Sequence, residues 1–269
     1  MDYDILIVGG GMVGASLACA LGDTTLRIGV LETAPAKTEW PEDDYDIRVS
    51  AITRATELVF RGIGAWEGMC ERRVTPYSHM TVWDATGSGQ IEFDAGEIAE
   101  PNLGYIIENR VILAALLERM ATFSNVELLC PALCTSLTRD AERAHLTLED
   151  GRELSARLIV GADGANSWVR DQAGISTTGW AYDQTAVVAT IKTSKPHGDT
   201  AWQRFLPDGP LAFLPMPNGL SSIVWSTSPE RAAELVAMEE SQFLDELQQD
   251  FGERLGRMEA TGPRGAYPL

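Results

Sequence analysis

The first 32 residues contain the feature that most constrains the fold. An apolar run from Ile5 to Val8 leads directly into Gly9-Gly10-Gly11-Met12-Val13-Gly14. A helix-like stretch of small residues follows, and a second apolar run ends at Glu32. Continuous apolar runs are typical of strands that are buried on both faces of a parallel sheet. This order predicts a β-α-β unit that opens on a glycine-rich turn.

The spacing of the three motif glycines and the acid predicts a nucleotide site. Such glycines permit a tight turn, close approach of a pyrophosphate and close helix packing, and the helix N-terminus presents free N–H groups. Glu32 lies 18 residues beyond Gly14, where a carboxylate can accept hydrogen bonds from both ribose hydroxyls. A carboxylate there disfavours a 2′-phosphate, which favours FAD or NAD over NADP. The alternative is a glycine-rich turn that holds no ligand.

A second motif runs from Leu158 to Arg170 as LIVGADGANSWVR. Its apolar start predicts a buried strand, which brings Asp163 to a glycine-flanked turn before a helix that begins near Asn166-Ser167. Asp163 can hydrogen-bond a ribityl or pyrophosphate group. The alternative is an ordinary Asp-Gly turn followed by an Asn or Ser helix cap.

Composition excludes several classes of partner. Among 269 residues, 39 are Asp or Glu and 21 are Lys or Arg, which gives a net charge of −18. Such a surface repels nucleic acid and anionic lipid. We expect no membrane span, because the sequence contains no apolar run of about 18 residues. No export signal is recognised at the N-terminus, and the cysteines lack metal-ligand spacing, so we expect free thiols, no metal and a cytoplasmic location.

The rest of the chain predicts alternating helices and strands, with a surface loop at 33–47. Helical spacing covers 55–63, 109–120 and much of 230–251, and hairpin patterns cover 79–94 and 133–148. Further strands are predicted at 126–129, 158–160, 186–192, 201–206, 210–216 and 221–226.

Three motifs together resemble the class A flavoprotein aromatic hydroxylases, the relatives of para-hydroxybenzoate hydroxylase. They are the glycine motif, Arg48-Val-Ser-Ala-Ile52 and Gly161-Ala-Asp-Gly-Ala-Asn-Ser167. More narrowly, the chain resembles the bacterial ubiquinone-biosynthesis hydroxylases from residue 3 to residue 269. That narrower resemblance rests on the segments 103–109, 202–210, 212–216 and 223–229.

The resemblance implies an α/β fold with two domains. A discontinuous, Rossmann-like FAD-binding domain of the GR2 type would comprise residues 1–75 and 102–180. A substrate domain built on a mostly antiparallel β-sheet would comprise 76–101 and 181–269.

The resemblance also implies roles for cofactor-binding residues. Those that match the ADP-binding motif are Gly9, Gly11, Gly14 and Glu32. Arg48 matches an arginine that reaches the FAD pyrophosphate, and Asn109 matches a helix-start residue beside the flavin. Asp163 matches a residue that serves both FAD and the incoming nicotinamide cofactor. From the residues alone, Arg48 could equally be a solvated arginine and Asn109 a plain helix cap. Cys134 falls near the adenine-contacting backbone, or is simply a buried thiol.

The implied activity is FAD-dependent aromatic hydroxylation. NAD(P)H would reduce the flavin, and O2 would form a C4a-hydroperoxide that hydroxylates the ring of a polyprenylated phenol or benzoquinol in ubiquinone biosynthesis. Because the cofactor carries the chemistry, no side chain is assigned as catalytic. Candidate substrate-facing residues are Phe213, Pro215 and Val224, with ordinary core positions as the alternative. Other ubiquinone-biosynthesis proteins are candidate partners, and contact with the inner membrane could come through them or the substrate.

One departure from the family qualifies this expectation. The family continues beyond Leu269 with a Gly-Asp-Ala flavin motif and a C-terminal helical part, so the chain is an excised part of a longer protein or a natural fragment. We expect these residues alone to be inactive. Two alternatives stay open: a flavin-dependent dehydrogenase or reductase, and a non-catalytic flavin- or lipid-binding scaffold of the same pathway.

Overall fold

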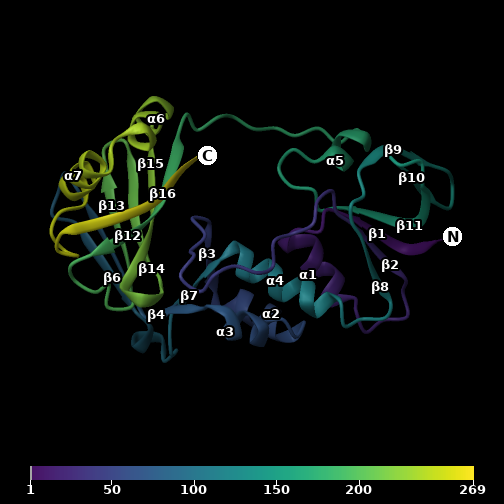
Figure 1. Ribbon diagram of the computed structural model, residues 1–269, viewed down its shortest axis with the longest axis horizontal. Helices are drawn as coiled ribbons and strands as arrows, with labels where there is room; N and C mark the ends of the chain where they lie inside the picture. The colour runs from purple at the N-terminus through teal and green to yellow at the C-terminus, as the bar shows by residue number, and fades with distance from the viewer. Residues whose placement is uncertain (1) are drawn as a thin grey trace. The chain divides into compact units, whose positions relative to one another are not determined.

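The computed structural model describes residues 2–269 and divides the chain into two compact units (Figure 1). The first unit comprises Met1–Pro41, Thr56–Arg72 and Asn109–Gly179. The second unit comprises Glu42–Ala55, Arg73–Glu108 and Trp180–Leu269. Both units are discontinuous in sequence.

The first unit contains a six-stranded sheet in the order β8-β2-β1-β11-β10-β9. Its strands are β1 (Tyr3–Val8), β2 (Ile28–Leu31), β8 (Val126–Leu129), β9 (Cys134–Arg139), β10 (Ala144–Leu148) and β11 (Glu153–Gly161). The first four strands of that order pair in parallel, and β10 and β9 extend the sheet in antiparallel fashion. Its helices are α1 (Met12–Ala20), α2 (Arg54–Gly62), α3 (Trp66–Arg72), α4 (Asn109–Met120) and α5 (Trp168–Gln172).

The predicted β-α-β unit is present as β1, α1 and β2. Ile5 lies opposite Ile28 and Val8 opposite Leu31 in a parallel register. All four residues of β2 are buried, which explains why its sequence is a continuous apolar run rather than an alternating one. The glycine motif therefore lies at the carboxyl end of β1, next to the carboxyl ends of β2 and β11.

The second unit contains a seven-stranded sheet in the order β16-β12-β15-β14-β13-β5-β6. Its strands are β5 (His79–Asp84), β6 (Gln90–Asp94), β12 (Thr185–Thr193), β13 (Thr200–Leu206), β14 (Gly209–Pro215), β15 (Leu220–Thr227) and β16 (Met258–Pro268). Only the pair of β13 and β5 is parallel, so the sheet is mostly antiparallel, as expected. A separate three-stranded sheet contains β3 (Val49–Thr53), β4 (Thr75–Tyr77) and β7 (Gly104–Glu108).

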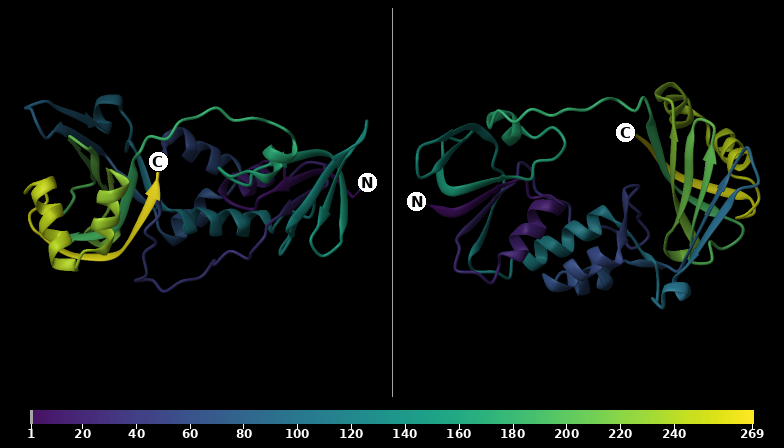
Figure 2. Two further views of the ribbon diagram at one scale, coloured as in Figure 1. Left: turned by 90° about the horizontal axis from the view of Figure 1, so that it is seen from above. Right: turned by 180° about the vertical axis from the view of Figure 1, so that it is seen from behind.

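The helices α6 (Pro229–Ala237) and α7 (Glu240–Phe251) lie on one face of the seven-stranded sheet (Figures 1 and 2). The core beneath them contains Phe213, Trp225 and Phe243. Alternate strand residues point to the opposite face, which we call the open face. Residues at the centre of the open face, such as Val188, are partly exposed.

Several elements were not predicted from the sequence. Strand β16 contains three Gly or Pro residues between Gly262 and Gly265 and lacks apolar alternation, yet it pairs with β12 along most of its length. The short strands β3, β4 and β7 and the helix α3 were also missed. Because β3, β7 and the start of β4 belong to the second unit, its boundaries differ from the predicted domain ranges at 42–55, 73–75, 102–108 and 180.

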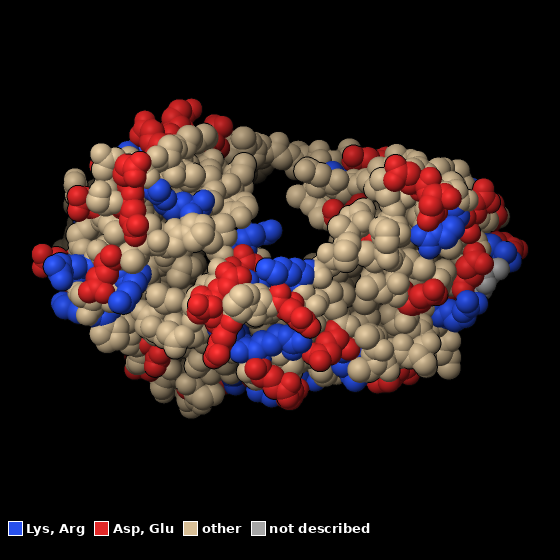
Figure 3. All heavy atoms as spheres, viewed as in Figure 1, with Lys and Arg blue, Asp and Glu red and all other residues tan. Residues whose placement is uncertain are grey.

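Acidic side chains are spread over the surface and gather over α6 in the second unit (Figure 3). This distribution agrees with the net charge of −18. Among residues 2–269, no helix is both long and apolar enough to cross a membrane.

Candidate cofactor site

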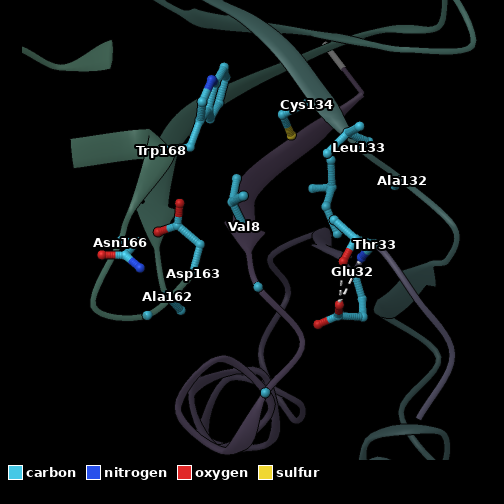
Figure 4. A pocket seen from close by; sticks show the side chains of 14 residues that line it. Val8, Glu32, Thr33, Ala132, Leu133, Cys134, Ala162, Asp163, Asn166 and Trp168 are labelled. Atoms are coloured by element: carbon cyan, nitrogen blue, oxygen red, sulfur yellow. Dashed lines mark hydrogen bonds between the residues drawn. The ribbon is translucent and has the colours of Figure 1, made fainter. Parts of the chain in front are cut away.

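A pocket of about 480 Å³ lies in the first unit at the carboxyl ends of β1, β2 and β11 (Figure 4). Gly9, Gly11, Glu32 and Asp163 all line it, so the structure brings together four of the residues singled out in the sequence. In open α/β sheets, ligands bind outside the carboxyl ends of the strands. The pocket therefore has the location expected for a nucleotide.

Two motif glycines are required by the protein's own packing. A Cβ on Gly9 would lie 2.4 Å from the carbonyl oxygen of Ala162, and its φ of +104° also disfavours other residues. A Cβ on Gly14 would lie 1.9 Å from the carbonyl oxygen of Gly9. Because neither residue has a side chain, the turn can fold back on itself and α1 can pack closely on β1.

Gly11 differs from both of these glycines. Its φ is −68°, which any residue adopts, and a Cβ there would meet no protein atom within 4 Å. Packing within the protein does not explain this glycine, but close approach of a ligand to the backbone does. Gly11 is also the N-cap of α1 and supplies no side-chain cap, so this helix end suits an anionic group.

Glu32 lies on the opposite side of the pocket from Asp163 (Figure 4). One carboxylate oxygen accepts a hydrogen bond from the backbone N–H of Gly10 at 2.8 Å, and the other accepts from the backbone N–H of Thr33 at 2.8 Å. These bonds fix the carboxylate on the glycine turn. Oε1 also accepts from the Thr33 hydroxyl at 3.1 Å and from the backbone N–H of Ala34 at 3.4 Å. Oε2 has only the Gly10 N–H as a partner among the described residues, so this oxygen is the one that can accept from a ribose hydroxyl.

Asp163 is held by the beginning of α5. Its carboxylate accepts hydrogen bonds from the Ser167 hydroxyl and from the backbone N–H of Val169, while Ser167 caps the helix through Arg170 N–H. Burial alone would raise the pKa of Asp163, but these hydrogen bonds outweigh it and hold the pKa below its usual value. Asp163 therefore both accepts hydrogen bonds from the start of α5 and lines the pocket.

The end of the pocket away from the glycine turn is apolar. Leu133, Cys134 and Trp168 line it, and Cys134 points toward the cavity (Figure 4). Burial, with a smaller contribution from Asp163, raises the pKa of the Cys134 thiol to about 11, so this thiol stays protonated at neutral pH. Trp168 was not predicted to line a site, although it directly follows the Asn166-Ser167 pair at which the helix was expected to begin.

Arg48 and Asn109 occupy different compact units. Asn109 is the first residue of α4. Arg48 is exposed in the second unit, where its guanidinium lies 5.4 Å from the centre of the Tyr267 ring. Its chain segment is anchored, because the buried Glu108 accepts from the Asp46 backbone N–H at 2.7 Å.

The structure separates the three predicted substrate-facing residues. Phe213 and Pro215 are buried on the face that is covered by helices, and the Phe213 ring lies 4.0 Å from that of Phe251. Val224 lies opposite Ala212 in the register and therefore points to the open face, where it is partly exposed. Phe213 thus occupies the core position that was weighed as the alternative.

The chain is similar to known flavoproteins over nearly its whole length. A family model described as an FAD binding domain matches residues 2–264. Rat ubiquinone biosynthesis monooxygenase COQ6 is 41% identical over 264 residues, which cover 93% of this chain and 55% of the relative. Escherichia coli 3-demethoxyubiquinol 3-hydroxylase is 36% identical over 266 residues, which cover 99% of this chain and 68% of the relative. The chain therefore spans between about half and two thirds of the length of these relatives.

Solved structures share the fold. A variant of Pseudomonas aeruginosa PqsL superposes with a TM-score of 0.81 at 22% identity, covering 99% of this chain and 73% of that one. The flavin-dependent monooxygenase PieE, in complex with FAD and substrate, gives 0.74 at 18% identity and covers 100% of this chain and 50% of that one. Together with the pocket, the matches confirm the predicted resemblance: the chain belongs to the FAD-binding domain family, in the branch of the ubiquinone-biosynthesis hydroxylases.

Proposed function

We propose that these residues form the adenosine-binding and substrate-binding parts of an FAD-dependent monooxygenase that hydroxylates a polyprenylated phenol or quinol in ubiquinone biosynthesis. One observation supports this most strongly. Gly11 and Glu32 line the same pocket, and a Cβ on Gly11 would meet no protein atom within 4 Å beside a helix N-terminus that has no side-chain cap, which leaves room for a ligand. The names of the ubiquinone-pathway relatives support the substrate class.

FAD fits the pocket by its chemistry. Backbone N–H groups at the start of α1 would bind the pyrophosphate, Glu32 would bind the ribose, and the apolar end with Cys134 and Trp168 would take the adenine ring. When bound, FAD would supply the redox chemistry that couples NAD(P)H and O2 to hydroxylation of a substrate ring. We further propose that Arg48 and Asn109 contact the cofactor and that Asp163 serves it through the turn at 161–167.

In this proposal the protein's own task is to bind, orient and exclude water. Val224, on the open face, is the predicted residue best placed to contact a substrate, whereas Phe213 and Pro215 support the strand from beneath. We propose a cytoplasmic protein whose hydrophobic substrate is delivered by partners from the same pathway, since an acidic surface of −18 repels anionic lipid.

The proposal is tested by FAD titration followed by an oxygen-insertion assay. The chain should quench flavin fluorescence on binding, and Gly11→Ala should weaken this binding without unfolding the protein. When the full-length natural protein that contains these residues oxidises NAD(P)H in the presence of O2 and a prenylated quinol, it should yield a product with one added oxygen atom. Oxidation without oxygen insertion would favour a dehydrogenase, and absence of FAD binding would contradict the assignment of the pocket.

A further inference from the structure

The open face of the seven-stranded sheet carries an unbroken uncharged row that the cofactor pocket does not involve. Strand register places one residue from each of six neighbouring strands directly side by side. From β12 to β6, these residues are Val188, Val224, Ala212, Gln203, Val82 and Ile91. Residues directly opposite each other in a sheet point to the same face, so the six side chains form one continuous strip.

Exposure along this row rises toward one edge of the sheet. The first five side chains are partly exposed, whereas Ile91 on the edge strand β6 is 60% exposed. The neighbouring row ends likewise on Phe93, which is 48% exposed and pairs with Met80. Two large apolar side chains are thus left in water at the end of a strip whose other face is already packed by α6 and α7.

Charge distinguishes this strip from the rest of the surface. None of its six members is ionisable, although 22% of the chain is charged and the net charge is −18. A strip without Lys or Arg cannot attract an anionic bilayer, and one without charge of either sign does not suit a charged partner. An uncharged hydrocarbon can lie on such a surface without burying an unpaired charge, provided that the Gln203 amide, the one polar group of the row, keeps a hydrogen-bond partner.

The strip is also long. Strands lie about 4.8 Å apart, so the path from Val224 on β15 to Ile91 on β6 crosses four strand spacings, or about 19 Å. We propose that this strip binds the polyisoprenoid tail of the substrate, with the ring near Val224 and the tail leaving the protein over Ile91 and Phe93. This inference rests on the proposed function and adds a path for the tail to it.

The test compares quinones that carry one or four isoprene units. Trp83 and Trp202 lie on the opposite side of β5 and β13, so their fluorescence should report a quinone bound across these strands. The 269-residue chain should bind the four-unit quinone at least about tenfold more tightly than the one-unit quinone, because more apolar area is buried. Ile91→Gln and Phe93→Gln, both at exposed positions, should abolish that difference and leave one-unit binding unchanged.

Leu58→Gln is the matched control, because Leu58 is 68% exposed on α2 in the first unit. It should preserve the dependence on tail length. A four-unit quinone with a diazirine at the tail end should label peptides that contain residues 79–94.

Three outcomes would overturn the proposal. If neither quinone binds, the substrate assignment of the proposed function fails together with the tail path. If both bind equally, or if Ile91→Gln behaves like Leu58→Gln, the tail path fails and the proposed function stands. If Ile91→Gln instead converts a dimer to a monomer in sedimentation without changing quinone binding, the strip is a self-association surface.

Discussion

The cofactor pocket of the first unit and the open face of the second unit are built from the chain in different ways. The pocket is lined by four short segments, 8–11, 31–33, 132–134 and 162–168, and within each segment the lining residues are near neighbours in sequence. The open face takes one residue from each of several strands, and β5 and β13 are separated by over a hundred residues. Local sequence therefore identifies the individual lining segments of the pocket, whereas only strand register identifies the residues of the open face.

The same contrast applies to what individual residues do. In the pocket, Gly9 and Gly14 serve the protein's own packing, and Gly11 has no such role. On the sheet, Phe213 serves the core and Val224 does not. In the first unit Gly14 supports the fold and the nearby Gly11 is free to contact a ligand. In the second unit Phe213 and Val224 form the corresponding pair. Substitutions at each position can therefore separate the two roles.

The largest expected effect is on the sheet. Phe213 is fully buried beside Phe251, so Phe213→Ala should lower the free energy of unfolding by about 3–5 kcal/mol. Val224→Ala, at a partly exposed position, should cost less than about 1 kcal/mol. Urea denaturation of both variants measures these values. Equal costs at the two positions would mean that the two faces of this sheet do not differ as described.

A smaller effect is expected at the glycine turn. Gly14→Ala would place a Cβ against the Gly9 carbonyl oxygen, and forcing the two apart should cost about 1–3 kcal/mol. Gly11→Ala should cost about 0.5–1 kcal/mol of stability, because Ala is a poorer N-cap than Gly, while weakening FAD binding. Thermal unfolding and FAD titration separate the two effects. A Gly11→Ala protein with unchanged FAD affinity would remove the reason to place a pyrophosphate there.

Much of the fold follows from sequence patterns. The runs at 5–8 and 28–31 identify buried parallel strands because both faces are covered, and the helix at 109–120 matches α4. By contrast, β16 was not predicted, because Gly262, Pro263 and Gly265 hide a strand that long-range pairing with β12 stabilises. The β-propensity of a segment does not include the stabilisation that a distant partner strand provides.

The candidate site shows the same division. Gly9, Gly11, Glu32 and Asp163 were predicted from spacing and do line one pocket. Phe213, Pro215 and Val224 were grouped by strand period and adjacency. The two-residue period of a strand shows which residues of one strand point to the same face, such as Phe213 and Pro215. It cannot say which residue of the next strand lies opposite, and the register places Val224 on the other face.

A further prediction concerns the Glu32 carboxylate. Glu32→Gln should keep a hydrogen bond to the turn but lose the negative charge, and charge-assisted bonds contribute about 1.5–3 kcal/mol each. We expect FAD affinity to fall by about tenfold, since one such bond is weakened rather than removed. Isothermal titration measures the change, with Glu39→Gln as a control because Glu39 is an exposed acid in the loop that follows β2. A loss of the same size in the control would indicate a general effect of charge.

The smallest expected effect is the pH dependence that Asp163 contributes. Its pKa in the folded protein lies below the usual aspartate value of 3.8, because hydrogen bonds from Ser167 and Val169 outweigh the effect of burial. A carboxyl group whose pKa is lowered on folding stabilises the protein above its unfolded pKa, and this stabilisation is lost as pH falls through the folded value. Asp163 is only partly buried, so solvent screening should limit its contribution to less than about 1 kcal/mol.

Urea denaturation of wild type and Asp163→Asn tests this. The difference in unfolding free energy between the two proteins should be largest at pH 7 and shrink below about pH 4. Ser167→Ala is the companion variant, because it removes one donor to Asp163 together with the cap of α5, which is worth about 1 kcal/mol. In that variant the acid-dependent part should diminish while the loss of the cap persists at every pH. A difference between wild type and Asp163→Asn that does not change from pH 7 to pH 3 would mean that Asp163 supports α5 through shape alone, and that its charge is available to a ligand.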